Sequence, residues 1–173
     1  METKNGLRWL RRLKIFGIVL VILAMVYLGV HFVCCEAVMG PFLNGEKNGS
    51  WYVTTDGLYE VSARRFGLME FYGEVHVERV GSRKVIIGGG AEQKPSCGLI
   101  VWRGVGFVEY GLMITTVPDG KRIVYYMVTI DENGEYVPDG TIVGEKEEFV
   151  KKYIEENKEE IMNMIGKYHS IGG

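Results

Sequence analysis

The chain has 173 residues, of which 47% are hydrophobic and 24% are charged, which suits one domain of ordinary globular character. Five of the 20 basic and one of the 22 acidic residues precede Ile15, so 15 basic and 21 acidic residues lie beyond it, a formal charge of −6. Because such a domain repels phosphate backbones, no nucleic acid is expected among its partners.

Residues 1–14 form a basic stem. Arg8, Arg11, Arg12 and Lys14 stand directly before a stretch without charged residues. Cationic flanks of a membrane helix stay on the cytoplasmic side. The stem therefore predicts a cytoplasmic N-terminus and a C-terminal domain outside, in a single-pass protein of the cell membrane.

The uncharged stretch covers residues 15–35 and consists mostly of Leu, Ile, Val and Phe. About 20 apolar residues at 1.5 Å rise each cross the roughly 30 Å hydrocarbon core of a bilayer. We therefore predict one transmembrane helix over 15–35, stopped at Gly40-Pro41 and retained as a signal anchor. His31, near its outer end, is expected to extend toward the interface.

The alternative is a cleaved signal peptide. Cys35 and Ala37 are small residues at the two positions that a signal peptidase requires, which would give a mature protein that begins at Val38. However, the apolar run is longer than the 7–15 residues typical of a signal peptide. Retention is the favoured interpretation.

The chain has three cysteines, which could form disulfides or remain free thiols. Cys34 and Cys35 lie at the outer end of the predicted helix, and Cys97 lies in the outer domain. Cys34 or Cys35 could form a disulfide between two copies in a homodimer, and Cys97 could bridge to this pair. The other interpretation is that all three are small apolar residues with free thiols.

Residues 36–50 are rich in turn formers and are predicted to be a linker to an extracytoplasmic β-rich domain over 51–173. Asp56-Gly57 and Asn133-Gly134 are hairpin turn signals. No helical pattern separates the predicted strands, so the sheet should be antiparallel. About seven or eight short strands are expected, at 51–55, 58–62, 73–80, 84–87, 99–103, 107–117, 122–130 and 135–137.

The last element is an amphipathic helix predicted over 145–166, with Gly166 as the residue that ends it. Its apolar stripe either packs on the sheet of its own domain, which we favour, or offers a heptad set to a partner helix. The fold class is thus α+β: an N-terminal transmembrane helix, then a small, mainly antiparallel β domain closed by a C-terminal amphipathic helix.

Signals for chemistry are weak. His76, Cys97 and His169 do not stand at zinc-ligand spacing, so no metal or cofactor site is predicted. His76 should face water beside Glu74 and Glu78, opposite to the core. A nucleophilic pair of Cys97 and His76 can be drawn, but no nucleophile motif surrounds it.

The functional hypothesis is a membrane-anchored extracytoplasmic binding or assembly module, such as an accessory subunit of a membrane complex or a surface or virion component. Its expected partners are the lipid bilayer, a protein bound by the outer domain, and a second copy of the chain. The alternative is a membrane-tethered extracytoplasmic hydrolase with an unrecognised site, although the sequence favours a role without catalysis. Frequent Glu and Lys beside a single Gln resemble the composition of thermophile proteins.

Overall fold

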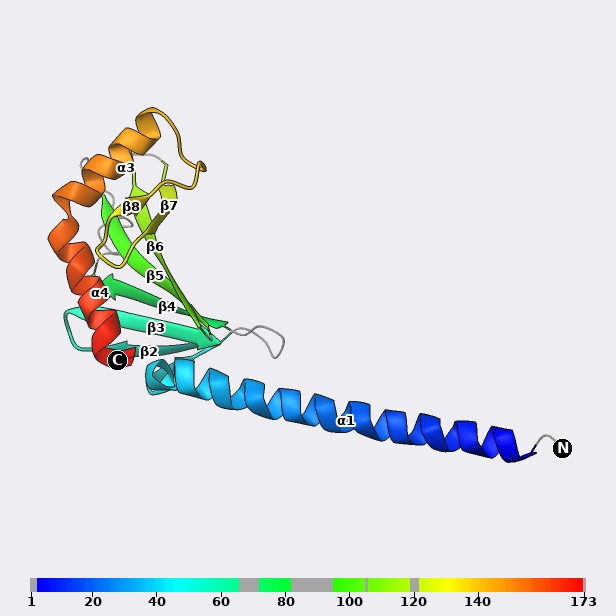
Figure 1. Cartoon of the computed structure of the whole chain (residues 1–173). Coiled ribbons are helices and arrows are strands. Elements are labelled where there is room, and N and C mark those ends of the chain that lie inside the picture. Colours follow the sequence, from blue (N-terminus) through cyan, green and yellow to red (C-terminus); the bar gives the residue numbers. More distant parts are fainter. Residues whose placement is uncertain (1–2, 66–71, 82–94, 105, 119–121, 173) are drawn as a thin grey trace.

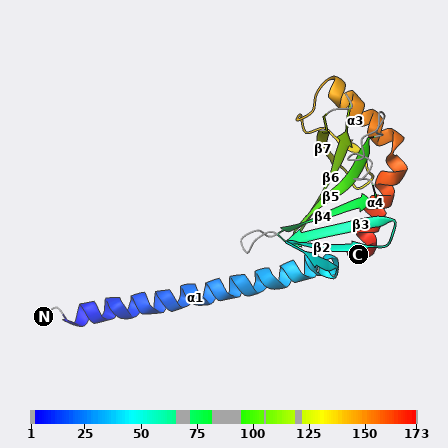
Figure 2. The same cartoon turned by 180° about the vertical axis from the view of Figure 1, so that it is seen from behind.

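The computed structural model describes residues 3–65, 72–81, 95–104, 106–118 and 122–172, which form a long N-terminal helix and a domain of sheet and helices (Figure 1). We call this domain the outer domain because it follows the helix in the chain. Helix α1 (Thr3–Met39) stands out from the outer domain as a rod in both views (Figure 2). It ends directly before Gly40-Pro41, as predicted, and the short 3₁₀ helix η1 (Gly40–Leu43) follows. The stretch Arg12–Leu43 has the length and composition to cross a membrane, a property that cleaved signal sequences share.

In the described residues, the outer domain is built on one eight-stranded sheet in which each strand lies beside its neighbours in the chain. All seven pairings are antiparallel, so the predicted antiparallel sheet is confirmed. The strands are β1 (Glu46–Asn48), β2 (Trp51–Thr55), β3 (Tyr59–Arg65), β4 (Tyr72–Arg79), β5 (Ser96–Gly104), β6 (Phe107–Thr116), β7 (Val124–Ile130) and β8 (Tyr136–Val137).

Two predicted turns connect strands as expected. At the β2–β3 turn, Gly57 has a φ of +88°, and the Asp56 carboxylate accepts hydrogen bonds from the backbone of residues 58 and 59. Gly134 has a φ of +72° in the β7–β8 turn. The sheet contains one strand that was not predicted, β1. Its residues are exposed and polar, so its composition resembles that of a linker. The strand predicted over 84–87 lies outside the described residues.

The C-terminal helix is two helices, α3 (Glu145–Glu156) and α4 (Lys158–Gly172). Asn157 separates them with a φ of −115°, and its side-chain amide donates to the carbonyl of Tyr153 at 2.8 Å. The prediction that Gly166 ends the helix is wrong. The apolar stripe continues through the buried Tyr168 to Ile171, so the helix extends to Gly172.

The core lies between one face of the sheet and the two helices, which run along that face in both views (Figures 1 and 2). The helices therefore pack on their own sheet, the arrangement that we favoured over a partner helix. Most of the buried apolar side chains belong to this layer: Tyr59, Val61, Ala63, Val75, Val77, Leu99, Val101, Leu112, Ile114, Val128, Ile130, Val150, Tyr153, Ile154, Ile161, Met164, Ile165 and Tyr168.

The end of α1 also belongs to this core. Residues 36–50, expected as a linker, hold the last turn of α1, then η1 and β1. Met39 and Phe42 are buried, and the Phe42 ring stacks on Tyr168 of α4 with 5.2 Å between ring centroids. Gly73 permits the contact, because a Cβ there would lie 2.4 Å from the Met39 methyl group. The long helix is thus fastened to the outer domain by side-chain packing.

Candidate functional site

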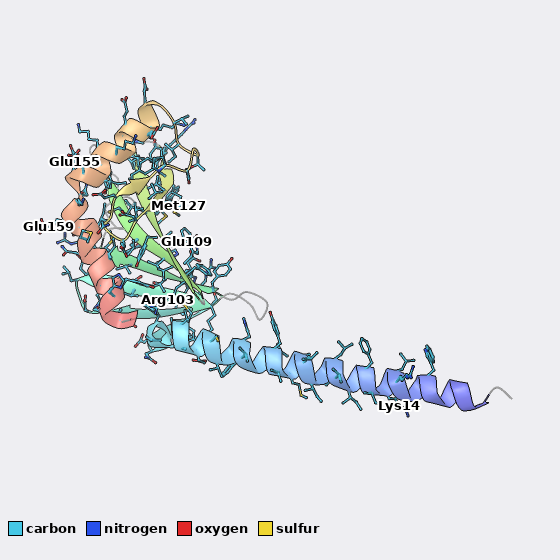
Figure 3. All side chains as sticks on the ribbon, in the orientation of Figure 1. Lys14, Arg103, Glu109, Met127, Glu155 and Glu159 are labelled. Atoms are coloured by element: carbon cyan, nitrogen blue, oxygen red, sulfur yellow. The ribbon has the colours of Figure 1, made fainter. Side chains whose placement is uncertain are left out.

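The strand register assigns every side chain of the sheet to one of two faces. The core face lies under the helices, and we call the other the open face, since no helix of the described residues covers it. In Figure 3, Glu155 and Glu159 point away from the sheet on the helix side, while Glu109 and Met127 lie on the opposite side. The open face consists of Trp51, Val53, Thr55, Glu60, Ser62, Arg64, Tyr72, Glu74, His76, Glu78, Ser96, Gly98, Ile100, Trp102, Gly104, Phe107, Glu109, Gly111, Met113, Thr115, Tyr125, Met127, Thr129 and Val137.

Charged side chains gather on the β2–β4 part of the open face. The two oxygens of the Glu74 carboxylate have different partners: Oε1 is hydrogen-bonded to Nε2 of His76, and Oε2 accepts from Nε and Nη2 of Arg64 at 2.9 and 2.7 Å. Trp51 covers both partners of the carboxylate, since the Arg64 guanidinium lies 4.5 Å from its ring centroid and the His76 ring meets it edge-on at 4.9 Å. These four side chains form the Glu74 cluster.

The Glu74 cluster keeps a carboxylate ionised in a covered place. The Glu74 residue is only 7% exposed. Burial raises the pKa of its carboxyl, but the hydrogen bonds with His76 and Arg64 outweigh this and leave the pKa below its ordinary value. His76 was predicted to face water, and this part of the prediction is wrong, because Trp51 and Glu74 cover most of its ring. The prediction that it points away from the core is confirmed by its register.

Two glycines shape the open face further along the sheet. A Cβ at Gly111 would lie 2.6 Å from the Trp102 ring, so the absence of a side chain on β6 lets this indole lie across the strand. In the same way, a Cβ at Gly98 would lie 2.9 Å from the Glu78 side chain, which is buried. Trp102 and Glu78 therefore lie close against the backbone of the neighbouring strands.

The far part of the open face is apolar and exposed. Tyr125 and Met127 project from β7 into solvent. Beside them lies an open hollow of about 600 Å³ between β7 and the segment that precedes α3. It is lined by Val124, Tyr125, Tyr126, Met127, Thr141, Ile142, Val143, Glu145 and Lys146. This combination of exposed aromatic and thioether side chains is typical of surfaces that bind partners.

The structure separates Cys97 from His76. Cys97 is packed against the core beneath α3, while His76 is on the open face. Burial raises the pKa of the Cys97 thiol to about 11, although a hydrogen bond with Tyr153 works in the opposite direction. A thiol with that pKa is protonated near neutral pH and is a poor nucleophile. The pair therefore cannot act together.

The residues singled out in the basic stem and the predicted transmembrane helix belong to α1 and not to the sheet. Arg12 and Lys14 are exposed on α1, and Cys34 is a half-buried free thiol. The side chains of Arg8, Arg11 and Cys35 lie outside the described part of the structure. His31 was expected to extend to the interface, but it is only 5% exposed and its ring stacks on Tyr27. Orientation and a Cys34 or Cys35 disulfide stay predictions.

His169 projects near the end of α4, where its Nε2 lies 3.3 Å from the Tyr110 hydroxyl. Within the residues described, no group of three or more His, Cys, Asp or Glu side chains gathers in a way that could hold a metal ion. The Glu74 cluster was missed at the sequence level because its members come from three strands.

Comparison with known proteins gives no match: no family model fits the chain, and neither a curated protein nor a solved structure is similar to it.

Proposed function

We propose that this chain is a single-pass membrane protein whose outer domain, held outside the cytoplasm, binds a protein partner through the open face. The observation that carries the proposal is the contrast between the two faces of one sheet. One face packs against α3 and α4, while the other presents Tyr125 and Met127 to solvent. Exposed apolar side chains that gather on one face mark binding sites more often than scattered ones do.

The Glu74 cluster supports a binding role better than a catalytic one. Both oxygens of its carboxylate are engaged, and Trp51 covers the imidazole and the guanidinium. Ser62 is directly opposite His76 in the register, but the hydrogen bond of the imidazole goes to Glu74. The cluster is suited to keeping the face rigid, which lowers the entropy lost on association. The tethered hydrolase is the alternative, and no observation favours it.

The experiment compares two methionines of similar exposure on opposite sides of the domain. Met127, on the open face, is 43% exposed, and Met162, on α4, is 39% exposed. A photoreactive amino acid is placed at each position in the full chain and irradiated in intact cells. We expect a discrete protein adduct from position 127 and none from 162.

The matched substitutions Met127→Glu and Met162→Glu complete the test. Exposed sites tolerate such changes with little loss of stability, so both variants should fold. Met127→Glu should abolish the adduct formed from a reactive group at position 125, and Met162→Glu should leave it. Equal adducts from both faces, or a Met127→Glu variant that still forms its adduct, would contradict the proposal.

A further inference from the structure

The junction between α1 and the outer domain fixes which part of the domain lies nearest to the N-terminal helix. α1 continues as one helix into Met39, which is buried in the core against Gly73. Glu36, one turn earlier, forms a hydrogen-bonded ion pair with Arg65 at the end of β3. The two residues are three positions apart and therefore share one face of α1, which is the face held against the outer domain.

Coverage of α1 extends back into its apolar run. His31, Cys34 and Val38 follow at three- and four-residue spacings and so share one face of the helix. His31 is buried and the other two are half-buried, whereas Val30 and Phe32 are exposed on other faces. At 1.5 Å per residue, His31 lies about 7 Å before Glu36 along the helix axis. The covered face therefore overlaps the end of the stretch predicted to cross the bilayer.

The strand ends at this level carry exposed apolar side chains. Arg65 pairs with Gly73, Tyr72 pairs with Gly104, and Gly104 pairs with Phe107. The rings of Tyr72 and Phe107 are 6.1 Å apart between centroids. Phe107 is 41% exposed, and Val108 beside it is exposed as well. In both views these strand ends lie on the side from which α1 leaves the domain (Figures 1 and 2).

We propose that this strand end, with Tyr72, Phe107 and Val108, rests in the headgroup layer of the bilayer that α1 spans. The inference depends on the proposed membrane anchor. Aromatic side chains beside arginines are the residues that favour the membrane interface, and Arg65 and Arg103 lie at this end of an otherwise acidic domain. Arg103 is fixed by hydrogen bonds to the Tyr168 hydroxyl and the Gly172 carbonyl. The domain would thus lie on the bilayer in one fixed orientation.

The test uses the full chain in lipid nanodiscs, with tryptophan as the depth probe. Phe107→Trp is compared with Tyr125→Trp, which places the same probe at an exposed aromatic position on β7. Each variant is measured in nanodiscs with and without phospholipids brominated near the headgroup, and the emission of the parent chain is subtracted. We expect Phe107→Trp to lose more than about half of its added emission and Tyr125→Trp to lose little.

Three outcomes would overturn the inference. If Phe107→Trp is not quenched although the chain co-elutes with the nanodiscs, the anchor holds but the strand end does not touch lipid. If Tyr125→Trp is quenched equally, the domain lies on the bilayer by another surface. If the chain does not co-elute with the nanodiscs, the proposed anchor fails and this inference fails with it.

Discussion

Replacing Phe42 by alanine should lower the free energy of unfolding of the outer domain by about 3–5 kcal/mol, the usual cost of removing a buried phenylalanine ring. Phe42 is 3% exposed, stacks on Tyr168 and lies 5.7 Å from the guanidinium carbon of Arg103. Removal of the ring leaves a cavity between η1 and α4 that these two side chains cannot fill without losing their own contacts. A domain of this size loses roughly 3–5 °C of melting temperature per kcal/mol, so the melting temperature should fall by about 9–25 °C.

The assay is thermal unfolding of the full chain in a mild detergent, followed by near-ultraviolet circular dichroism. Phe32→Ala is the matched control, because Phe32 is 58% exposed on α1 and contributes nothing to the outer core. We expect Phe32→Ala to melt with the unchanged chain. If Phe42→Ala did so too, the segment after α1 would be a passive linker, and the rigid junction would be refuted.

Three further changes test the core and the two faces of the sheet. Ile154→Asp should unfold the outer domain, because it places an unpaired carboxylate in the core at a cost comparable with the whole stability of a domain, about 5–15 kcal/mol. The control Ile123→Asp changes an exposed residue and should be tolerated. Equal far-ultraviolet circular dichroism spectra of the two variants would contradict this prediction. Glu74→Gln should cost about 1–3 kcal/mol at neutral pH by urea titration. The pKa of Glu74 is lowered in the folded state, so the difference in free energy of unfolding between the parent chain and Glu74→Gln should be full above about pH 4.5 and shrink as the pH falls further. A difference that does not depend on pH would contradict this. Cys97 should react with iodoacetamide at pH 8 at least about tenfold more slowly in the folded chain than after unfolding, because burial raises the pKa of its thiol. Equal rates in the two states would contradict its buried position.

Local signals in the sequence predicted the elements whose cause is local. Asp56-Gly57 predicts its hairpin because glycine accepts the positive φ of the turn and the aspartate binds the following amides. Gly40-Pro41 predicts the end of α1 for an equally local reason. β1 has no such signal, since it is a short, polar edge strand that exists only because β2 pairs with it.

Contacts between residues that are far apart in the chain could not be predicted from the sequence. The turn formers of residues 36–50 led to the prediction of a linker, although this segment holds the buried Met39 and Phe42. Their burial depends on contacts with Gly73 and Tyr168, which are far along the chain. The period-two pattern of β4 indicated correctly that His76 points away from the core. It could not show what lies there, because β2 supplies the covering ring of Trp51.

The register of the sheet links the core to the proposed binding surface. Because side chains alternate along a strand, the pairing that buries Val75 and Val77 also sends His76 to the open face. A slip of one residue in β4 would exchange the two sets and place imidazole under the helices at the cost of two buried valines. The same alternation on β7 buries Val128 and exposes Met127. The open face is therefore specified by the hydrophobic core, and substitutions at its exposed positions, such as Tyr125 and Met127, should change the proposed binding without weakening the fold.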